Sequence, residues 1–212
     1  MFASIVTAAR AQKSVHWTLA AAAPVMGAWT STGDVTGYSG SELVRHQGAT
    51  MRVLLVNDTI YARAVPGGSH SYGPKLAPYK RVWSIFYLYG LDLTLGQAKR
   101  YAGKWISIPK GDKNYSQLAD GMTLGSIAPS NPHFGPLKAR RRTSHGTRFI
   151  DVWEEAGIPG FPYEVKARES GTPLPIALSY IDNFSVGYSK WNEPVHVQPP
   201  AKAAPIASVR RS

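Results

Sequence analysis

A two-residue alternation of apolar and polar side chains recurs along this chain and constrains its fold more than any other feature. In FPYEVKAR (161–168) every second residue is apolar, and SVHWTL (14–19) and LPIALSY (174–180) repeat the pattern. This period is typical of strands in an antiparallel sheet with one buried face and one wetted face. The chain therefore predicts a sheet-rich protein, and we expect about nine to eleven strands.

Two segments predict the turns of β-hairpins. Asn57-Asp58 separates the apolar run MRVLLV (51–56) from TIYARA (59–64), and both flanking segments are rich in β-forming residues. Ser170-Gly171-Thr172-Pro173 predicts a second hairpin, because Gly171 can adopt the positive φ that such a turn requires.

Short helices are expected before and between the strands. Starting at Phe2, apolar side chains follow the i, i+3, i+4, i+7 spacing of one helix face. LTLGQAKRYAG (93–103) predicts a short helix, and KWISIP (104–109) predicts a strand that ends at its proline. NYSQLADGM (114–122) predicts a third helix with Asn114 as its candidate N-cap.

Two other segments are expected to lack regular structure. Residues 65–83 contain much Gly, Ser, Pro and Tyr and predict a loop, and residues 198–212 predict a flexible Pro/Ala-rich basic tail. A length of 212 residues favours one domain, which we expect to span residues 1–197.

The motif Trp191-Asn192-Glu193-Pro194 is similar to the acid/base segment of barrel glycosidases. Glycoside hydrolysis needs a second carboxylate across the substrate, and no Asp or Glu follows Glu193. A (β/α)₈ barrel also takes about 250 residues, more than this chain has. We therefore interpret the motif as the end of a strand, where Pro194 limits ladder pairing.

The chain is strongly basic, with 24 Lys and Arg against 13 Asp and Glu and a net charge of +11. Nucleic acid is the obvious partner for such a charge. The densest basic run, residues 138–142, has no base-reading motif beside it, so we expect no specific nucleic-acid binding. An anionic membrane surface explains the charge as well, and so does a solvated basic face.

Enzymatic and metal chemistry find little support in the sequence. The chain has no cysteine, so it has neither disulfides nor a thiolate nucleophile. Its six histidines are not paired at i, i+2 or i, i+4, and it contains neither a Gly-x-Ser-x-Gly elbow nor a phosphate-binding loop. We expect no enzyme activity, no metal and no cofactor.

The N-terminus does not have the pattern of an export signal. Arg10 and Lys13 come after the apolar residues, whereas a secretory signal has its basic residues first. Apolar runs also stay well below the roughly 18 residues of a membrane span. We expect the N-terminal segment to be a helix of the folded domain.

The order of four segments resembles actinobacterial lipoproteins of the LppX/LprG type and their extracytoplasmic relatives. The segments are YAGKWISIP (101–109), YSQLADGMTLGSI (115–127), ESGTPLPI (169–176) and YSKWNEPVHVQPP (188–200). The resemblance covers roughly residues 5–206 and implies a LolA-like α+β fold. In that fold, a strongly curved antiparallel sheet, or half-barrel, carries helices on its concave side.

The resemblance also implies a function. Members of this family bind or carry lipids or acylated glycolipids outside the cytoplasmic membrane, without catalysis, and are anchored through a lipidated cysteine. This chain departs from the family because it contains no cysteine and no lipobox. We expect an extracytoplasmic, monomeric lipid carrier. The alternative is a structural cell-envelope domain of the same fold with a collapsed cavity.

Lipid carriage needs an apolar cavity, and its expected lining consists of inward-facing strand residues and the segment 84–91 at its mouth or lid. Plain core packing is the alternative for each of these residues. The candidate lining residues are Trp17, Leu19, Leu55, Tyr61, Ile85, Phe86, Leu88, Trp105, Tyr163, Val165 and Leu178.

Overall fold

One curved sheet dominates the computed structural model, which describes residues 1–23, 27–67, 78–129, 136–154, 163–180 and 183–212. The strand order is β12-β6-β5-β4-β3-β2-β1-β11-β10-β9-β8-β7, and all neighbours are antiparallel except β12 and β6. The strands are β1 (Ser14–Ala23), β2 (Gly27–Thr36), β3 (Gly40–His46), β4 (Ala49–Val56), β5 (Thr59–Pro66), β6 (Ile106–Pro109), β7 (Leu137–Ser144), β8 (Thr147–Glu154), β9 (Tyr163–Arg168), β10 (Pro175–Tyr180), β11 (Phe184–Ser189) and β12 (Ala204–Pro205).

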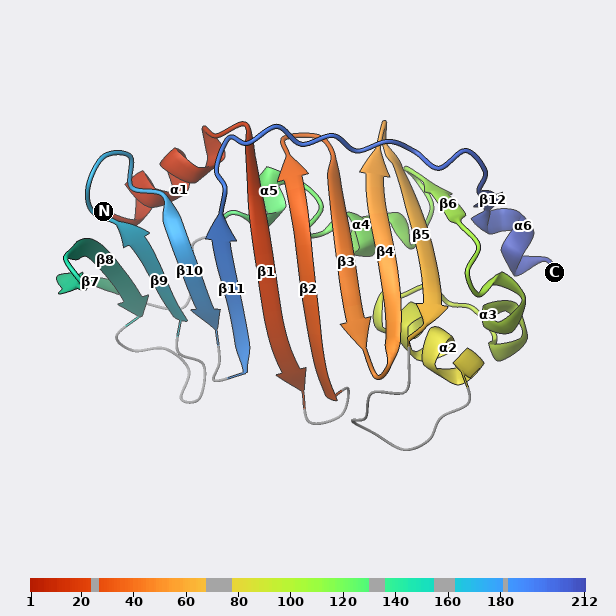
Figure 1. Cartoon of the computed structure of the whole chain (residues 1–212). Coiled ribbons are helices and arrows are strands. Elements are labelled where there is room, and N and C mark those ends of the chain that lie inside the picture. The colour runs from red at the N-terminus through yellow and green to blue at the C-terminus, as the bar shows by residue number, and fades with distance from the viewer. Residues whose placement is uncertain (24–26, 68–77, 130–135, 155–162, 181–182) are drawn as a thin grey trace.

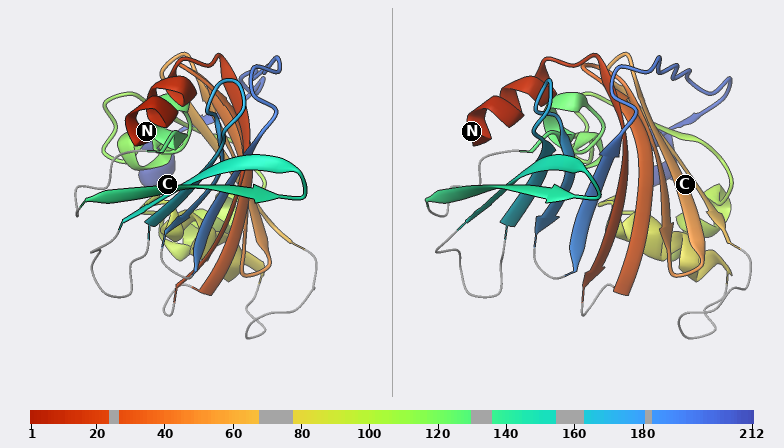
Figure 2. Two further views of the ribbon diagram at one scale, coloured as in Figure 1. Left: turned by 90° about the vertical axis from the view of Figure 1, so that its left-hand side faces the viewer. Right: turned by 60° about the vertical axis from the view of Figure 1, so that its left-hand side comes forward.

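Six short helices accompany the sheet within the described residues, and they lie on its concave side (Figures 1 and 2). Helix α1 lies toward the β7 end of the sheet, α5 lies over the central strands, and the other four lie toward the β6 end. The helices are α1 (Phe2–Arg10), α2 (Pro78–Leu88), α3 (Leu95–Tyr101), α4 (Tyr115–Ala119), α5 (Leu124–Ile127) and α6 (Ile206–Arg210).

The buried apolar residues form three clusters along the concave face. The largest joins β3–β6 to α2, α4 and α6, and residues such as Val53, Ile60 and Val82 are fully buried in it. A second cluster packs Ile5 of α1 against β8 and β9, and a third surrounds Trp17 beneath α5. The core is thus divided along the sheet into two end clusters and a central cluster beneath α5.

Both predicted hairpin turns are confirmed. Asn57 and Asp58 have φ values of 48° and 56° between β4 and β5, which is the positive-φ pair that a tight two-residue hairpin requires. Gly171 has a φ of 74° between β9 and β10.

The expected N-terminal helix and the strand ending at Pro109 are also confirmed, as α1 and β6. The helix expected over 93–103 is α3, which begins after a capping box of Thr94 and Gln97. Asn114 precedes α4, but its side chain makes no cap hydrogen bond. It donates to the Gly90 carbonyl and accepts from Arg210 instead.

The loop expected over 65–83 is wrong at both ends. Strand β5 runs to Pro66, and α2 begins at Pro78, where a proline fits the first helical turn. Val82, Ile85 and Phe86 then share the buried face of this helix, which packs on β4 and β5.

The prediction of a flexible tail over 198–212 is wrong. After β11 the chain crosses along one end of the strands to the far edge of the sheet, where Ala204-Pro205 pairs in parallel with β6 (Figure 1). Helix α6 buries Ile206 and Val209, which are 2% and 0% exposed. The Arg210 guanidinium makes bonds of 2.8 and 2.9 Å to the two carboxylate oxygens of Asp112. This packing orders a segment whose own composition favours disorder.

Candidate functional site

An apolar row crosses the concave face beside the cluster that α5 covers. Leu19 of β1, Val186 of β11, Leu178 of β10 and Val165 of β9 are successive cross-strand partners. Adjacent to this row, Trp29, Ala21 and Phe184 are partners across β2, β1 and β11. Side chains opposite each other in a sheet lie on the same face, so the two rows form one surface. We call Leu19, Ala21, Trp29, Leu178, Phe184 and Val186 the central concave patch.

Much of the central concave patch is only partly buried by the described residues. Leu19, Trp29, Leu178 and Phe184 retain intermediate exposure, whereas Val186 is 4% exposed. A concave apolar surface in partial contact with water is suited to covering an apolar chain.

Four of the predicted lining residues lie on this face. Leu19 and Leu178 belong to the patch, and Val165 continues its row as a fully buried residue. Trp17 lies one row away and is 2% exposed among the residues that pack beneath α5.

Three further predicted residues occupy the packed core at the other end of the sheet. Leu55, Ile85 and Phe86 are 3%, 0% and 0% exposed and belong to one cluster between the sheet and α2. Ile85 and Phe86 therefore do not lie at a mouth or lid, because they are on the sheet-facing side of α2. Leu88, at the end of α2, has intermediate exposure.

The prediction that Tyr61 and Trp105 face inward is wrong. Ile60 and Ala62 are buried in the core, so alternation places Tyr61 on the outer face. Trp105 precedes the buried Ile106, and the Arg63 guanidinium lies 6.0 Å from its ring centroid on the outer side. The side chains of Ile60 and Ala62 therefore face the helices, and the ring of Tyr61 faces away from them. Tyr163 lies in β9, but its side chain is outside the described residues.

A buried polar pair lies beside the patch. The Tyr89 hydroxyl donates to the Glu42 carboxylate over 2.7 Å and lies 3.5 Å from the Ser31 hydroxyl. Ser31 is the cross-strand partner of Leu19. Burial raises the pKa of Glu42, and the hydrogen bonds from Tyr89 and Ser31 oppose that shift. Burial likewise raises the pKa of Tyr89. This pair brings one polar contact to the edge of an apolar surface.

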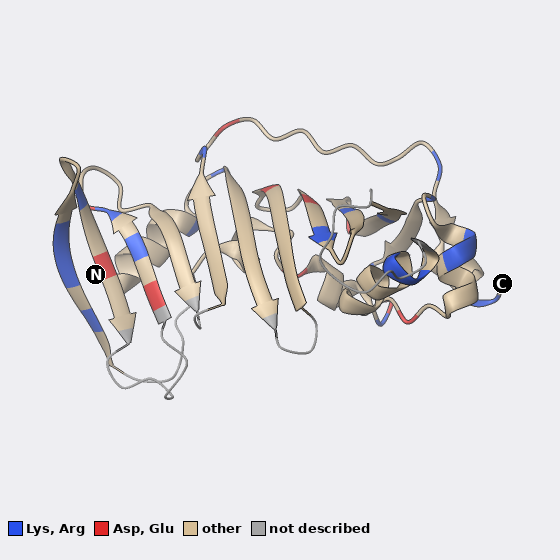
Figure 3. Cartoon of the chain, turned by 60° about the horizontal axis from the view of Figure 1, so that its bottom comes forward, with Lys and Arg blue, Asp and Glu red and all other residues tan. Residues whose placement is uncertain are grey.

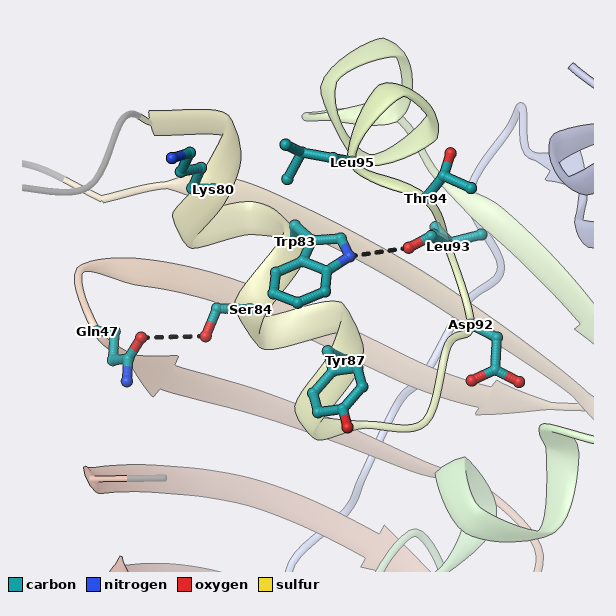
Figure 4. A pocket seen from close by; sticks show the side chains of 9 residues that line it. All are labelled: Gln47, Lys80, Trp83, Ser84, Tyr87, Asp92, Leu93, Thr94 and Leu95. Carbon is teal, nitrogen blue, oxygen red and sulfur yellow. Dashed lines mark hydrogen bonds between the residues drawn. The ribbon is translucent and has the colours of Figure 1, made fainter. Parts of the chain in front are cut away.

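A hollow lies on the solvent side of α2, and it was not predicted from the sequence. It has a volume of about 740 Å³, within the usual range of small-molecule sites (Figure 4). Its helical lining follows the i, i+3, i+4, i+7 spacing, which is the signal that could have revealed it. We call this hollow the α2 groove, lined by Gln47, Lys80, Trp83, Ser84, Tyr87, Asp92, Leu93, Thr94 and Leu95.

Two aromatic rings form a fixed wall of the α2 groove. The rings of Trp83 and Tyr87 stack with centroids 5.4 Å apart, and the Trp83 indole donates to the Leu93 carbonyl over 2.9 Å. Tyr87 is 66% exposed. Polar groups border these rings, as Figure 4 shows for Lys80 and Asp92. A flat aromatic surface with hydrogen-bonding groups around it suits a ligand that is apolar on one face and polar at its edges.

The acidic residue of the groove is held in place by a neighbour. Lys113 donates to the Asp92 carboxylate over 2.7 Å, and this bond lowers the pKa of Asp92. On the opposite side, the Ser84 hydroxyl donates to the Gln47 side chain over 3.1 Å.

The patch and the groove approach one another at the turn between β3 and β4. Trp29 of the patch is the cross-strand partner of His46, and Gln47 of the groove follows His46 in the chain.

The Trp191–Pro194 motif lies where a strand end was expected. Strand β11 ends at Ser189, and Lys190 and Asn192 adopt positive φ values of 52° and 65°. The Asn192 side chain accepts from the Lys13 backbone over 2.8 Å and donates to Gln12 over 2.7 Å. Glu193 accepts from the Ser14 hydroxyl through its backbone carbonyl. The motif joins the end of β11 to the start of β1.

Metal ligands do not converge within the part of the chain that the structure describes: no group of three or more His, Cys, Asp or Glu side chains forms a potential site. Over the same residues, none of the helices is both long enough and apolar enough to cross a membrane.

The sheet and its helices define a half-barrel of the LolA-like α+β fold class, as the resemblance implied. LprF from Mycobacterium bovis is similar to this chain, with a TM-score of 0.54, 12% identity and 95% of each chain covered. The resemblance to lipoproteins of this type is thereby confirmed for the fold. The lipoprotein LppX from Mycobacterium tuberculosis is also found, with a TM-score of 0.48, 17% identity and coverage of 93% of this chain and 96% of LppX. No protein-family model and no curated protein sequence matches the chain.

Proposed function

We propose that this protein binds and carries a lipid without catalysis, and that the acyl chain lies on the central concave patch. The observation that carries the proposal is the apolar row of Leu19, Val186, Leu178 and Val165 beside α5, in which Leu19 and Leu178 remain partly exposed. Each buried CH₂ group contributes about 0.8 kcal/mol, so a chain of ten such groups would gain roughly 8 kcal/mol before ordering costs.

The same proposal extends to an acylated glycolipid, with its sugar in the α2 groove. The stacked rings of Trp83 and Tyr87 offer a flat apolar surface to a sugar ring. Lys80, Asp92 and Gln47 supply donors and acceptors for hydroxyl groups around it. An acyl chain would fit this groove less well, because an open groove leaves much of the chain in water.

The carrier is proposed to act as a monomer outside the cytoplasmic membrane and beside an anionic membrane surface. The resemblance to extracytoplasmic lipoproteins and the basic net charge of +11 support this location. The exposed Glu193, which is held through its backbone and not its carboxylate, supports a non-catalytic role for the one glycosidase-like motif.

A structural cell-envelope domain without a ligand is the second candidate. The observation that favours it is the filled core at the β6 end of the sheet, where Ile85 and Phe86 are fully buried. In that case the central concave patch would be covered by protein and not by lipid.

Organic extraction of the purified protein, followed by mass spectrometry, separates these candidates. A carrier should release an acyl-chain species in near-stoichiometric amount, and a structural domain should release none. For a glycolipid, the species should carry sugar in the wild type, and Trp83→Ala/Tyr87→Ala should lose sugar-bearing species while it keeps simple acyl chains. Identical extracts from the two proteins would contradict the assignment of the sugar to the groove.

A further inference from the structure

The outer face of β7, β8 and β9 carries an array of cations and aromatic rings at one end of the sheet. Lysines and arginines gather on these edge strands (Figure 3). The register places three cross-strand rows on this face: Lys138–Trp153–Glu164, Arg140–Asp151–Lys166 and Arg142–Phe149–Arg168. Five cations and two carboxylates therefore share one face, a surplus of three positive charges.

The carboxylate at the centre of the array is concealed by its neighbours. Asp151 is 0% exposed, and its Oδ2 atom lies 3.3 Å from Arg140 Nε and 3.7 Å from Arg142 Nε. Both arginine side chains remain about half exposed, at 54% and 50%. The surface that meets solvent is consequently more positive than the sequence composition of the three strands suggests.

The aromatic rings of the array lie beneath cations. The Arg140 guanidinium is 5.1 Å from the Trp153 ring centroid, and the Lys166 ammonium is 5.9 Å from that of Phe149. Both rings are partly exposed. Trp and Lys or Arg side chains together suit the boundary between an apolar layer and water, where the ring meets the apolar side and the charge stays wet.

We propose that this outer face docks the protein on an anionic lipid bilayer. The charge complementarity is direct, since an anionic leaflet attracts surface cations within about one Debye length. The sheet presents its cations as a two-dimensional array on its outer face, with rows spaced by two residues along each strand, so that several cations can meet headgroups at once. Nucleic acid fits the face less well, because the rings of Trp153 and Phe149 each lie against a cation and are only partly exposed, so that neither ring projects freely for base stacking. This inference names the surface that would contact the anionic membrane of the proposed function, and it stands apart from the lipid carriage, because no residue of the central concave patch or the α2 groove enters it.

Vesicle co-sedimentation tests the proposal, with vesicles of pure phosphatidylcholine and of phosphatidylcholine with 30% phosphatidylglycerol as probes. Lys138→Gln/Arg168→Gln leaves the Arg140–Asp151–Arg142 contacts intact and should weaken binding to the anionic vesicles about tenfold or more. Binding should also fall steeply with salt, and pure phosphatidylcholine should retain little protein.

A matched control removes the same charge from the same part of the sheet. Arg141 and Arg148 lie on the opposite face of β7 and β8, because they alternate with the cations of the array. Arg141→Gln/Arg148→Gln should therefore bind the anionic vesicles like the wild type. Trp153→Ala should weaken binding while it leaves the salt dependence unchanged.

Three results would overturn the proposal. Equal weakening in both double variants would show that net charge alone attracts the protein. Tighter binding to a single-stranded RNA than to anionic vesicles at the same salt would favour nucleic acid. If the wild type does not bind vesicles and Lys138→Gln/Arg168→Gln aggregates, the cations serve only to protect an open sheet edge.

Discussion

Trp17 and Gly33 are cross-strand partners, and the Trp17 indole occupies the space that a side chain at position 33 would need. A Cβ atom at Gly33 would lie 2.9 Å from the Trp17 ring and closer still to the Ser41 carbonyl oxygen. The absence of a side chain at Gly33 therefore leaves room for Trp17, the largest buried side chain of the concave face, to pack against β2.

Gly33→Ala is expected to destabilise the protein by about 1–3 kcal/mol, the usual cost of overpacking. Urea denaturation of both proteins measures this difference. Gly37→Ala is the matched control, because a Cβ at Gly37 meets no atom within 4 Å. If both variants unfold at the wild-type urea concentration, the fit between Trp17 and Gly33 does not limit stability.

The strand pattern was readable from the sequence because it depends on local alternation. The hairpin turn at Asn57-Asp58 and the helix face that starts at Phe2 were readable for the same reason. The face on which each side chain lies was harder to predict where the alternation is weak. In TIYARA both Ile60 and Tyr61 are apolar, so only tertiary packing against α2 decides that Ile60 and Ala62 face inward and Tyr61 outward.

Contacts distant in sequence account for what could not be predicted. Helix α6 has five residues, too few to be stable alone, and it is held by Arg210 and Asp112, which are 98 positions apart. The α2 groove needs both the helix and the chain from Asp92 to Leu95 beside it. The central concave patch depends on pairing between β1 and β11, strands at opposite ends of the chain.

The ion pair of Arg210 and Asp112 should make the docking of the C-terminal segment sensitive to acid. The hydrogen bonds from Arg210 lower the pKa of Asp112, so this pair stabilises the fold fully above the ordinary Asp pKa. That contribution is lost as pH falls through the lowered folded-state pKa.

Arg210→Gln should cost about 1.5–3 kcal/mol at neutral pH, the range for hydrogen bonds to charged groups, and this loss of stability should shrink in acid. Thermal unfolding from neutral pH down to acid measures the deficit, with Arg211→Gln, an exposed neighbour, as the control. A deficit that is the same at every pH would contradict a role for the Asp112 charge.

The buried Glu42 should stabilise the fold more in acid than at neutral pH, which is the opposite of the pH dependence expected from Asp112. Because burial raises its folded-state pKa above the ordinary value of 4.5, the folded protein holds this proton more tightly than the unfolded chain does. Its contribution is greatest below 4.5 and falls as pH rises toward the raised pKa. Glu42→Gln keeps an acceptor for Tyr89 without the charge, so the variant should gain stability relative to wild type as pH rises. A constant difference across the pH range would show that Glu42 titrates alike in both states.

Two neighbouring substitutions in the Trp191–Pro194 motif distinguish a structural role from a catalytic one. Asn192→Ala removes two side-chain hydrogen bonds at a residue with a φ of 65°, so we expect a loss of about 1–3 kcal/mol. Glu193→Gln should leave both the folding stability and every measurable activity unchanged, because its backbone carbonyl makes the contact with Ser14. A glycosidase activity that collapses in Glu193→Gln would refute the structural interpretation.

Binding of an acyl chain to the central concave patch is the central property proposed for this protein. Leu19→Asn/Leu178→Asn places two polar side chains in the patch. The matched control, Thr18→Asn/Ser179→Asn, changes exposed neighbours on the outer face of the same strands. Circular dichroism and thermal unfolding establish that each protein is folded, and Phe184→Ala serves as a second patch variant if the first is unstable.

Titration of the delipidated proteins with a fluorescent fatty acid is the most direct measurement. We expect saturable binding by the wild type and by the outer-face control. The patch variant should bind at least about tenfold more weakly, because two buried CH₂ groups fewer already remove about 1.6 kcal/mol. Saturable binding that is equal in all three folded proteins, or no binding by the wild type, would contradict the placement of a lipid on the concave face.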